Sequence, residues 1–188
     1  KNSDSVPVAA TTQSGMNLPT GVASDGTNVA VADTANSRVL LWKSIPTTTG
    51  QKSDIVLGQP DFTTSTVTST TASSMRGPQG VWLQNGKLFV ADTGNHRIQK
   101  LDGAGKVVVA WGTEGTGDGQ FKEPMGVAVD REGNVWITDG NDNAPPAARG
   151  SAPAPLFTPN PAATQGHQVF KFSPTGQLLM TIGKPGGA

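Results

Sequence analysis

The 188-residue sequence contains no cysteine, no tyrosine and only two histidines. Without cysteine, the chain can form neither a disulfide nor a thiolate metal site. Its 14 basic and 14 acidic residues cancel, and no run of Lys or Arg supplies the concentrated positive surface that phosphate binding requires. With only six phenylalanines, a broad aromatic surface for stacking single-stranded bases is not expected either. We therefore expect no nucleic-acid partner.

Long hydrophobic runs are also missing from the sequence. No stretch approaches the roughly 20 apolar residues of a membrane-spanning helix, so we expect no membrane span. Residues 1–5 are polar and contain no apolar signal core. If the protein is exported, its signal has been removed or lies outside this chain.

Glycine and proline, by contrast, are abundant, with 24 and 14 residues, which is typical of an all-β chain of short strands and many turns. Three segments of the chain repeat. Each opens with a Pro-x-Gly-Val motif, at Pro19, Pro78 and Pro124, and in the first two an Asp-Thr-x-Asn-x-Arg motif follows. The openings are 59 and 46 residues apart, close to the roughly 40–50 residues of a four-stranded propeller blade.

Each repeat divides into four expected strands, named a to d in chain order. Strand a ends at an Asp-Gly, Asn-Gly or Glu-Gly turn, where glycine supplies the positive φ of a tight hairpin. Strands b and d are apolar, and strand c follows the Asp-containing turn. The predicted divisions are residues 1–15, a possible outer strand of a preceding blade; 16–62, blade 1; 63–74, a Ser/Thr-rich loop; 75–120, blade 2; and 121–188, blade 3, with a Pro/Ala-rich insert at 144–166.

These motifs resemble the NHL-repeat family. The resemblance rests on the Pro-x-Gly-Val openings, the Val-Ala-Asp-Thr-x-Asn-x-Arg cores at 31–38 and 90–97, and the Trp-Gly to Gly-Gln-Phe passage at 111–121. The third unit, with Gly-His-Gln-Val-Phe-Lys-Phe-Ser-Pro at 166–174, is more similar to bacterial relatives of the peptidyl-α-hydroxyglycine amidating lyases. The resemblance implies a β-propeller, commonly of six blades. Three units are about half of such a ring, which further blades or self-association would close.

Two Asp/Arg pairs flank the turns between strands b and c. We interpret Asp33 with Arg38, and Asp92 with Arg97, as structural pairs, because residues on facing strands can pair and an Asp can cap the turn that follows it. A binding site at these pairs is the alternative. The Asp139-Gly-Asn-Asp-Asn run has the alternating oxygens of a Ca²⁺ loop but lacks the downstream bidentate Glu. We expect an ordinary b–c turn there.

The two histidines, His96 and His167, are too few for a catalytic zinc site, which usually takes three protein ligands and an open position. The resemblance to the amidating lyases implies zinc-binding histidines in a Pro-His-Gly opening. The matching positions in this chain are Thr20, Gln79 and Met125, which all depart from that pattern. We therefore predict no catalytic residue, no metal site and no cofactor in this chain.

The two low-complexity segments, 63–74 and 144–166, extend connections of the d–a and b–c types. In a four-stranded blade these connections emerge on the same face, where function concentrates. The Ser/Thr-rich segment buries little apolar surface, which predicts either a mobile loop or a glycan acceptor. We predict a candidate binding face on this side, formed by Thr20, Gln79, Trp82, Met125, Leu156 and Phe157.

The function expected from these features is that of a non-enzymatic NHL-repeat propeller, exported to the bacterial cell envelope or exterior, that binds a protein or extracellular ligand or serves in assembly. One alternative is an amidating-lyase-like metalloenzyme whose catalytic residues lie outside this segment. A second alternative is a structural subunit of an extracellular assembly, which low charge and Ser/Thr-rich loops favour.

Overall fold

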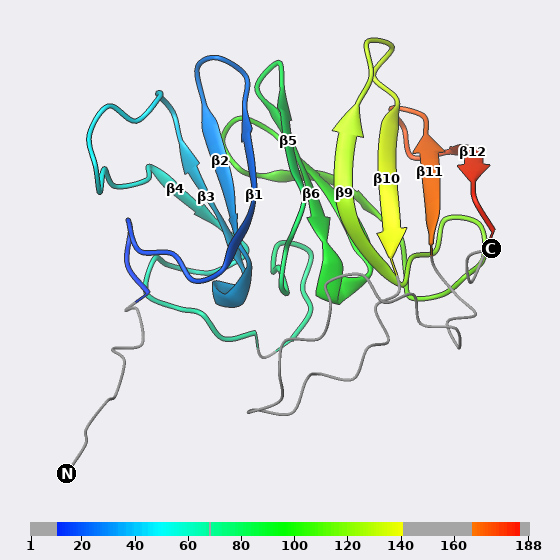
Figure 1. Ribbon diagram of the computed structural model, residues 1–188. Helices are drawn as coiled ribbons and strands as arrows, with labels where there is room; N and C mark the ends of the chain where they lie inside the picture. The colour runs from blue at the N-terminus through cyan, green and yellow to red at the C-terminus, as the bar shows by residue number, and fades with distance from the viewer. Residues whose placement is uncertain (1–10, 68, 141–166, 185–188) are drawn as a thin grey trace, which may run out of the picture.

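The computed structural model describes residues 11–67, 69–140 and 167–184, and in them it contains three four-stranded antiparallel sheets. Each sheet follows chain order from its inner to its outer strand, as expected for propeller blades (Figure 1). Blade 1 comprises β1 (Pro19–Ser24), β2 (Val29–Asp33), β3 (Arg38–Trp42) and β4 (Ile55–Leu57). Blade 2 comprises β5 (Val81–Gln84), β6 (Lys87–Asp92), β7 (Arg97–Leu101) and β8 (Val107–Trp111). Blade 3 comprises β9 (Glu123–Val129), β10 (Val135–Gly140), β11 (Gln168–Phe172) and β12 (Leu178–Ile182).

The turns within the blades form where the sequence places glycine or a Thr-x-Asn motif. Gly26, Gly86 and Gly133 lie in the a–b hairpins with positive φ values of 88°, 67° and 84°. Between strands b and c, the first two blades have short 3-10 turns, η1 (Thr34–Asn36) and η2 (Thr93–Asn95). The a–b hairpins point to one side of the molecule, and the b–c turns and d–a connections lie on the other (Figure 1). We call this second side the loop face.

Alternating side chains of each blade form two hydrophobic cores, one in each gap between blades. Ala30, Ala32, Val39 and Leu41 of blade 1 meet Val81, Leu83, Leu88, Val90 and Leu101 of blade 2. Phe89, Ala91 and Ile98 of blade 2 meet Val127, Val129, Val135, Ile137, Phe170 and Phe172 of blade 3. Strand β6 therefore contributes to both cores, because successive side chains of a strand point to opposite faces.

The glycines of the first two Pro-x-Gly openings allow neighbouring inner strands to approach closely. A Cβ atom at Gly21 would overlap the carbonyl oxygen of Gln79, and one at Gly80 would overlap that of Met125. Both clashes would be with backbone, which cannot move aside as a flexible side chain can. The motif that opens each repeat is thus a requirement of blade-to-blade packing.

The described residues therefore confirm the all-β fold and its four-stranded blades. The six-bladed ring remains a prediction. Among these residues, no helix is long and apolar enough to span a membrane.

Candidate functional site

The most extensive polar contacts of the loop face surround the aspartate that ends strand b. In blade 1, Asp33 pairs with Arg38 across β2 and β3, and Arg38 Nε lies 2.7 Å from Asp33 Oδ2 with both side chains fully buried. The other guanidinium nitrogens donate hydrogen bonds to the carbonyl oxygens of Thr12 (2.9 Å), Gly15 (2.7 Å) and Phe62 (2.6 Å). One arginine therefore neutralises the carboxylate and holds two other segments of the chain.

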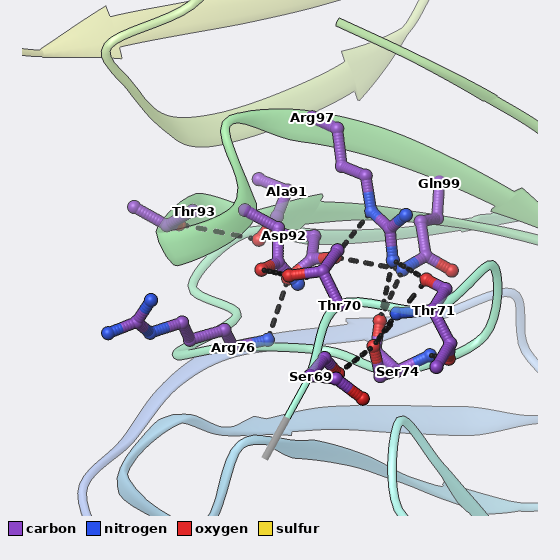
Figure 2. Close-up of polar contacts among 11 residues, drawn as sticks. Ser69, Thr70, Thr71, Ser74, Arg76, Ala91, Asp92, Thr93, Arg97 and Gln99 are labelled. Atoms are coloured by element: carbon purple, nitrogen blue, oxygen red, sulfur yellow. Dashed lines mark hydrogen bonds and ion pairs between the residues drawn. The ribbon is translucent and has the colours of Figure 1, made fainter. Parts of the chain in front are cut away.

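Blade 2 repeats this arrangement and adds to it (Figure 2). Arg97 Nε lies 2.8 Å from Asp92 Oδ2. The same carboxylate accepts hydrogen bonds from the backbone N–H of Arg76 (2.8 Å) and from the side-chain amides of Asn95 (3.0 and 3.1 Å) and Gln99 (2.9 Å). Asp92 is fully buried, so each of these donors offsets part of its desolvation.

The same network fastens part of the Ser/Thr-rich loop to blade 2. Arg97 Nη2 donates to the carbonyl oxygens of Thr71 (2.9 Å) and Ser74 (2.7 Å), and Gln99 Nε2 also donates to that of Ser74 (2.9 Å). The neighbouring Met75 is fully buried in the core between blades 1 and 2. The end of the 63–74 segment is thus hydrogen-bonded to blade 2.

The carboxylates do not cap the b–c turns, as the sequence analysis had suggested they could. Neither Asp33 nor Asp92 accepts a hydrogen bond from the backbone of the 3-10 turn that follows it. Each instead accepts the backbone N–H two residues before the opening proline, from Asn17 in blade 1 (2.6 Å) and Arg76 in blade 2. The aspartates therefore tie the incoming connection to their own blade.

A second contact, between blades, was missed in the sequence. The threonine after each aspartate donates to the carbonyl of the next blade's opening proline, from Thr34 to Pro78 (2.7 Å) and from Thr93 to Pro124 (2.7 Å). The Thr in the repeated motif was the signal that could have revealed it. In blade 3 the same position is Gly140.

Blade 3 keeps the aspartate without the arginine. Asp139 pairs in register with Gln168, and its carboxylate accepts the backbone N–H groups of Lys122 (3.0 Å) and Glu123 (2.8 Å). Asp139 is only 4% exposed. Burial raises the pKa of its carboxyl above the usual value; these hydrogen bonds and the charge of His96 oppose the rise, and the Glu123 carboxylate adds to it.

Of the three positions that match the amidating-lyase histidines, Thr20 lies on β1, Met125 lies on β9 and Gln79 lies two residues before β5. Thr20 is exposed, and its Oγ1 donates to the carbonyl oxygen of Gln79 (3.2 Å) on the adjacent blade. Gln79 is half-buried, and Met125 is 40% exposed. All three therefore lie along the inner end of the loop face. Trp82, also on an inner strand, packs against the core between blades 2 and 3, and its buried indole N–H has no hydrogen-bond partner among the described residues.

His96 is half-buried at the end of η2, and its ring Nδ1 contacts the carbonyl oxygen of Lys122. His167 is exposed just before β11. Within the described ranges, no group of three or more His, Cys, Asp or Glu residues could hold a metal ion. The rest of the Asp139 run, at 141–143, where we expected an ordinary b–c turn, lies outside the described residues, as do Leu156 and Phe157 of the candidate binding face.

A pocket of about 360 Å³ lies between the end of blade 1, the Ser/Thr-rich loop and blade 2. Its lining combines apolar side chains, among them Leu57 and Leu101, with the hydroxyl groups of serines and threonines from the loop. None of the described lining residues is charged.

The three sheets, their close inner strands and their connections on one face are the features of β-propeller blades. Residues 75–101, which span β5 to β7, match the family model of the NHL repeat. The chain therefore carries an NHL repeat in its second blade. It is also 35% identical over 78 residues to Protein SUPPRESSOR OF QUENCHING 1, chloroplastic, of Arabidopsis thaliana, a match that spans 37% of this chain and 7% of that protein.

Solved propeller structures share this fold at low sequence identity. Hydrazine synthase of Kuenenia stuttgartiensis superposes with a TM-score of 0.55 at 8% identity, covering 96% of this chain and 39% of that one. The gluconolactonase XC5397 of Xanthomonas campestris superposes with a TM-score of 0.51 at 17% identity, covering 89% of this chain and 48% of that one. This chain spans less than half the length of each of these proteins.

Replacing Arg97 by alanine tests the buried pair. The change would leave the Asp92 carboxylate buried without its cation, so we expect the free energy of unfolding to fall by about 3–5 kcal/mol. Arg131→Ala, at an exposed position, is the matched control and should change stability by less than about 0.5 kcal/mol. Urea denaturation of both variants measures the difference. Equal stability of the two variants would contradict the structural role of the pair.

The raised pKa of Asp139 predicts an unusual pH dependence. The protonated carboxyl of Asp139 binds its proton more tightly in the folded state than in the unfolded state. Protonation of Asp139 therefore stabilises the fold fully below the ordinary pKa of 3.8, and this stabilisation is lost as the pH rises through the pKa of Asp139 in the folded state. The Asp139→Asn variant cannot ionise at this position. The free energy of unfolding of the wild type, relative to this variant, should therefore fall as the pH rises, and a rise would contradict the assignment.

Proposed function

We propose that this chain is a non-enzymatic binding or assembly module of the cell envelope or exterior, and that it binds a protein partner through its loop face. NHL repeats commonly mediate protein binding, which supports this class of function. The proposal rests mainly on apolar side chains that lie exposed at the inner end of that face.

Leu18 is the observation that carries the proposal. It directly precedes β1, is 65% exposed and has a φ of 53°. The equivalent residue of blade 2 is Gly77, with a φ of 52°. A side chain in the left-handed region costs about 1–2 kcal/mol, and leaving leucine in water forgoes its burial. A binding role explains why both costs are tolerated at a position where blade 2, which has the same backbone conformation, has glycine.

The neighbouring residues extend this surface along the inner strands. Met125 is exposed on β9, and methionine adapts well to varied partner surfaces. Thr20 and Gln79 lie between Leu18 and Met125 and can provide polar contacts. Exposed apolar side chains flanked by polar groups are typical of protein interaction sites.

The amidating-lyase-like alternative would need residues beyond those described. The proposed extracellular or envelope location, and the alternative role as a structural subunit, are both compatible with a protein-binding loop face. A soluble folded protein with stoichiometric zinc and lyase turnover would instead favour the enzyme.

Site-specific photocrosslinking tests the proposed face. A photoreactive amino acid would be placed at Leu18, Gln79 or Met125 and, as matched controls, at the exposed hairpin-side positions Thr27, Glu132 and Thr175. In cells that produce this protein, we expect one discrete partner to crosslink from the loop-face positions. Crosslinks that form equally from both sides, or only from the hairpin side, would contradict the proposal.

A further inference from the structure

Gln168 of blade 3 occupies the position at which the other two blades have the arginine of the buried Asp/Arg pair. In blades 1 and 2, the residue in register with the last aspartate of strand b is Arg38 or Arg97. In blade 3, the residue in register with Asp139 is Gln168. The carboxylate has been kept, and its cation on the facing strand has been replaced by a neutral side chain.

The charge of Asp139 is therefore poorly compensated by the described residues. Its carboxylate accepts hydrogen bonds from the backbone N–H groups of Lys122 and Glu123. The Lys122 ammonium lies 3.2 Å from Glu114, so it pairs with a different carboxylate. The Glu123 carboxylate raises the pKa of Asp139, while His96 is the nearby group whose charge lowers it.

The two connection positions whose carbonyls complete the guanidinium site in blades 1 and 2 have counterparts in the sequence of blade 3, where the carbonyl of the second, Gly117, also accepts the backbone N–H of Gln120. In blade 2, Arg97 also donates to the carbonyls of Ser74 and Thr71, which lie four and seven residues before the opening proline. Arg38 uses the same two positions in blade 1. In blade 3 these positions are Gln120 and Gly117. A planar, five-donor guanidinium fits such a set of one carboxylate and two carbonyls better than an ammonium does.

We propose that Asp139 binds the guanidinium group of an arginine side chain that a protein partner supplies, in the position that Arg38 and Arg97 occupy in their own blades. Gln168 is partly exposed, so its side chain can move aside for the incoming group. A Cβ atom at Gly140, the residue after Asp139, would lie 2.9 Å from Met125 Sδ, so the site adjoins the surface of the proposed function, on which this inference rests.

A peptide titration followed by carboxyl ¹³C NMR tests the site in the full chain. The probe is Ac-Gly-Arg-Gly-NH₂ at millimolar concentration, and the matched control replaces arginine with citrulline, a neutral residue of the same shape. We expect the arginine peptide to lower the midpoint of Asp139 titration by about one pH unit or more. An equal response to both peptides, or no response to either, would overturn the proposal.

Two substitutions at position 168 give an independent test that keeps Asp139 intact. Gln168→Arg should restore the pair within the chain, lower the pKa of Asp139, raise the Tm and abolish the peptide response. Gln168→Ala is the matched control and should keep the peptide response. If Gln168→Arg leaves the Asp139 titration unchanged, this position does not face the carboxylate as proposed.

The chain's own Arg149, which lies outside the described residues, is tested with Arg149→Gln. A rise in the Asp139 midpoint in this variant would show that the chain itself supplies the cation, and the proposal would be wrong. If the arginine peptide does not shift the Asp139 titration but the loop-face positions still crosslink a partner, this inference is wrong and the proposed function stands. If the crosslinks fail as well, the proposed function also falls.

Discussion

The arrangement of the loop face depends on the hydrogen bonds that a buried aspartate, at the end of strand b in each blade, accepts from the incoming connection. Asp33, Asp92 and Asp139 each accept the backbone N–H two residues before the opening proline, so each ties the incoming connection to its blade. That connection positions the inner strand, which in turn packs its glycine against the neighbouring blade. A buried ion pair is weak evidence for net stability, because desolvation offsets much of its attraction. Its contribution here is to fix the chain path between blades.

The arginine partners extend this constraint to segments with little apolar content of their own. Arg38 holds residues near Thr12 and Phe62, and Arg97 holds the end of the Ser/Thr-rich loop. A low-complexity segment can therefore be ordered by backbone hydrogen bonds to one buried cation. Blade 3 keeps the same carboxylate and its backbone contact with Gln168 in the arginine position, so the link to the incoming connection does not require the arginine.

The strands could be predicted because their signals are local: alternating apolar residues, glycine turns and a motif repeated in three copies. The pairing of aspartate with arginine followed from the short b–c turn between them. The repeated Thr of the motif indicated that Thr34 has a role, but its partner Pro78 lies 44 residues away, so the local pattern did not identify the contact. Leu18 stands out only through its backbone φ and its exposure, which the sequence does not show. Gln168 stands out only because strand pairing across the 144–166 insert places it in register with Asp139, so neither residue could be recognised before the fold was known.

Native-state hydrogen exchange of three backbone amides tests the central claim most directly. The amides of Asn17, Arg76 and Lys122 lie in connections, where exchange is ordinarily fast, yet each donates to a buried aspartate. The account predicts that all three exchange as slowly as amides within the central strands. Exchange as fast as that of the exposed connection residue Thr116 would show that the aspartates do not hold the connections to the blades.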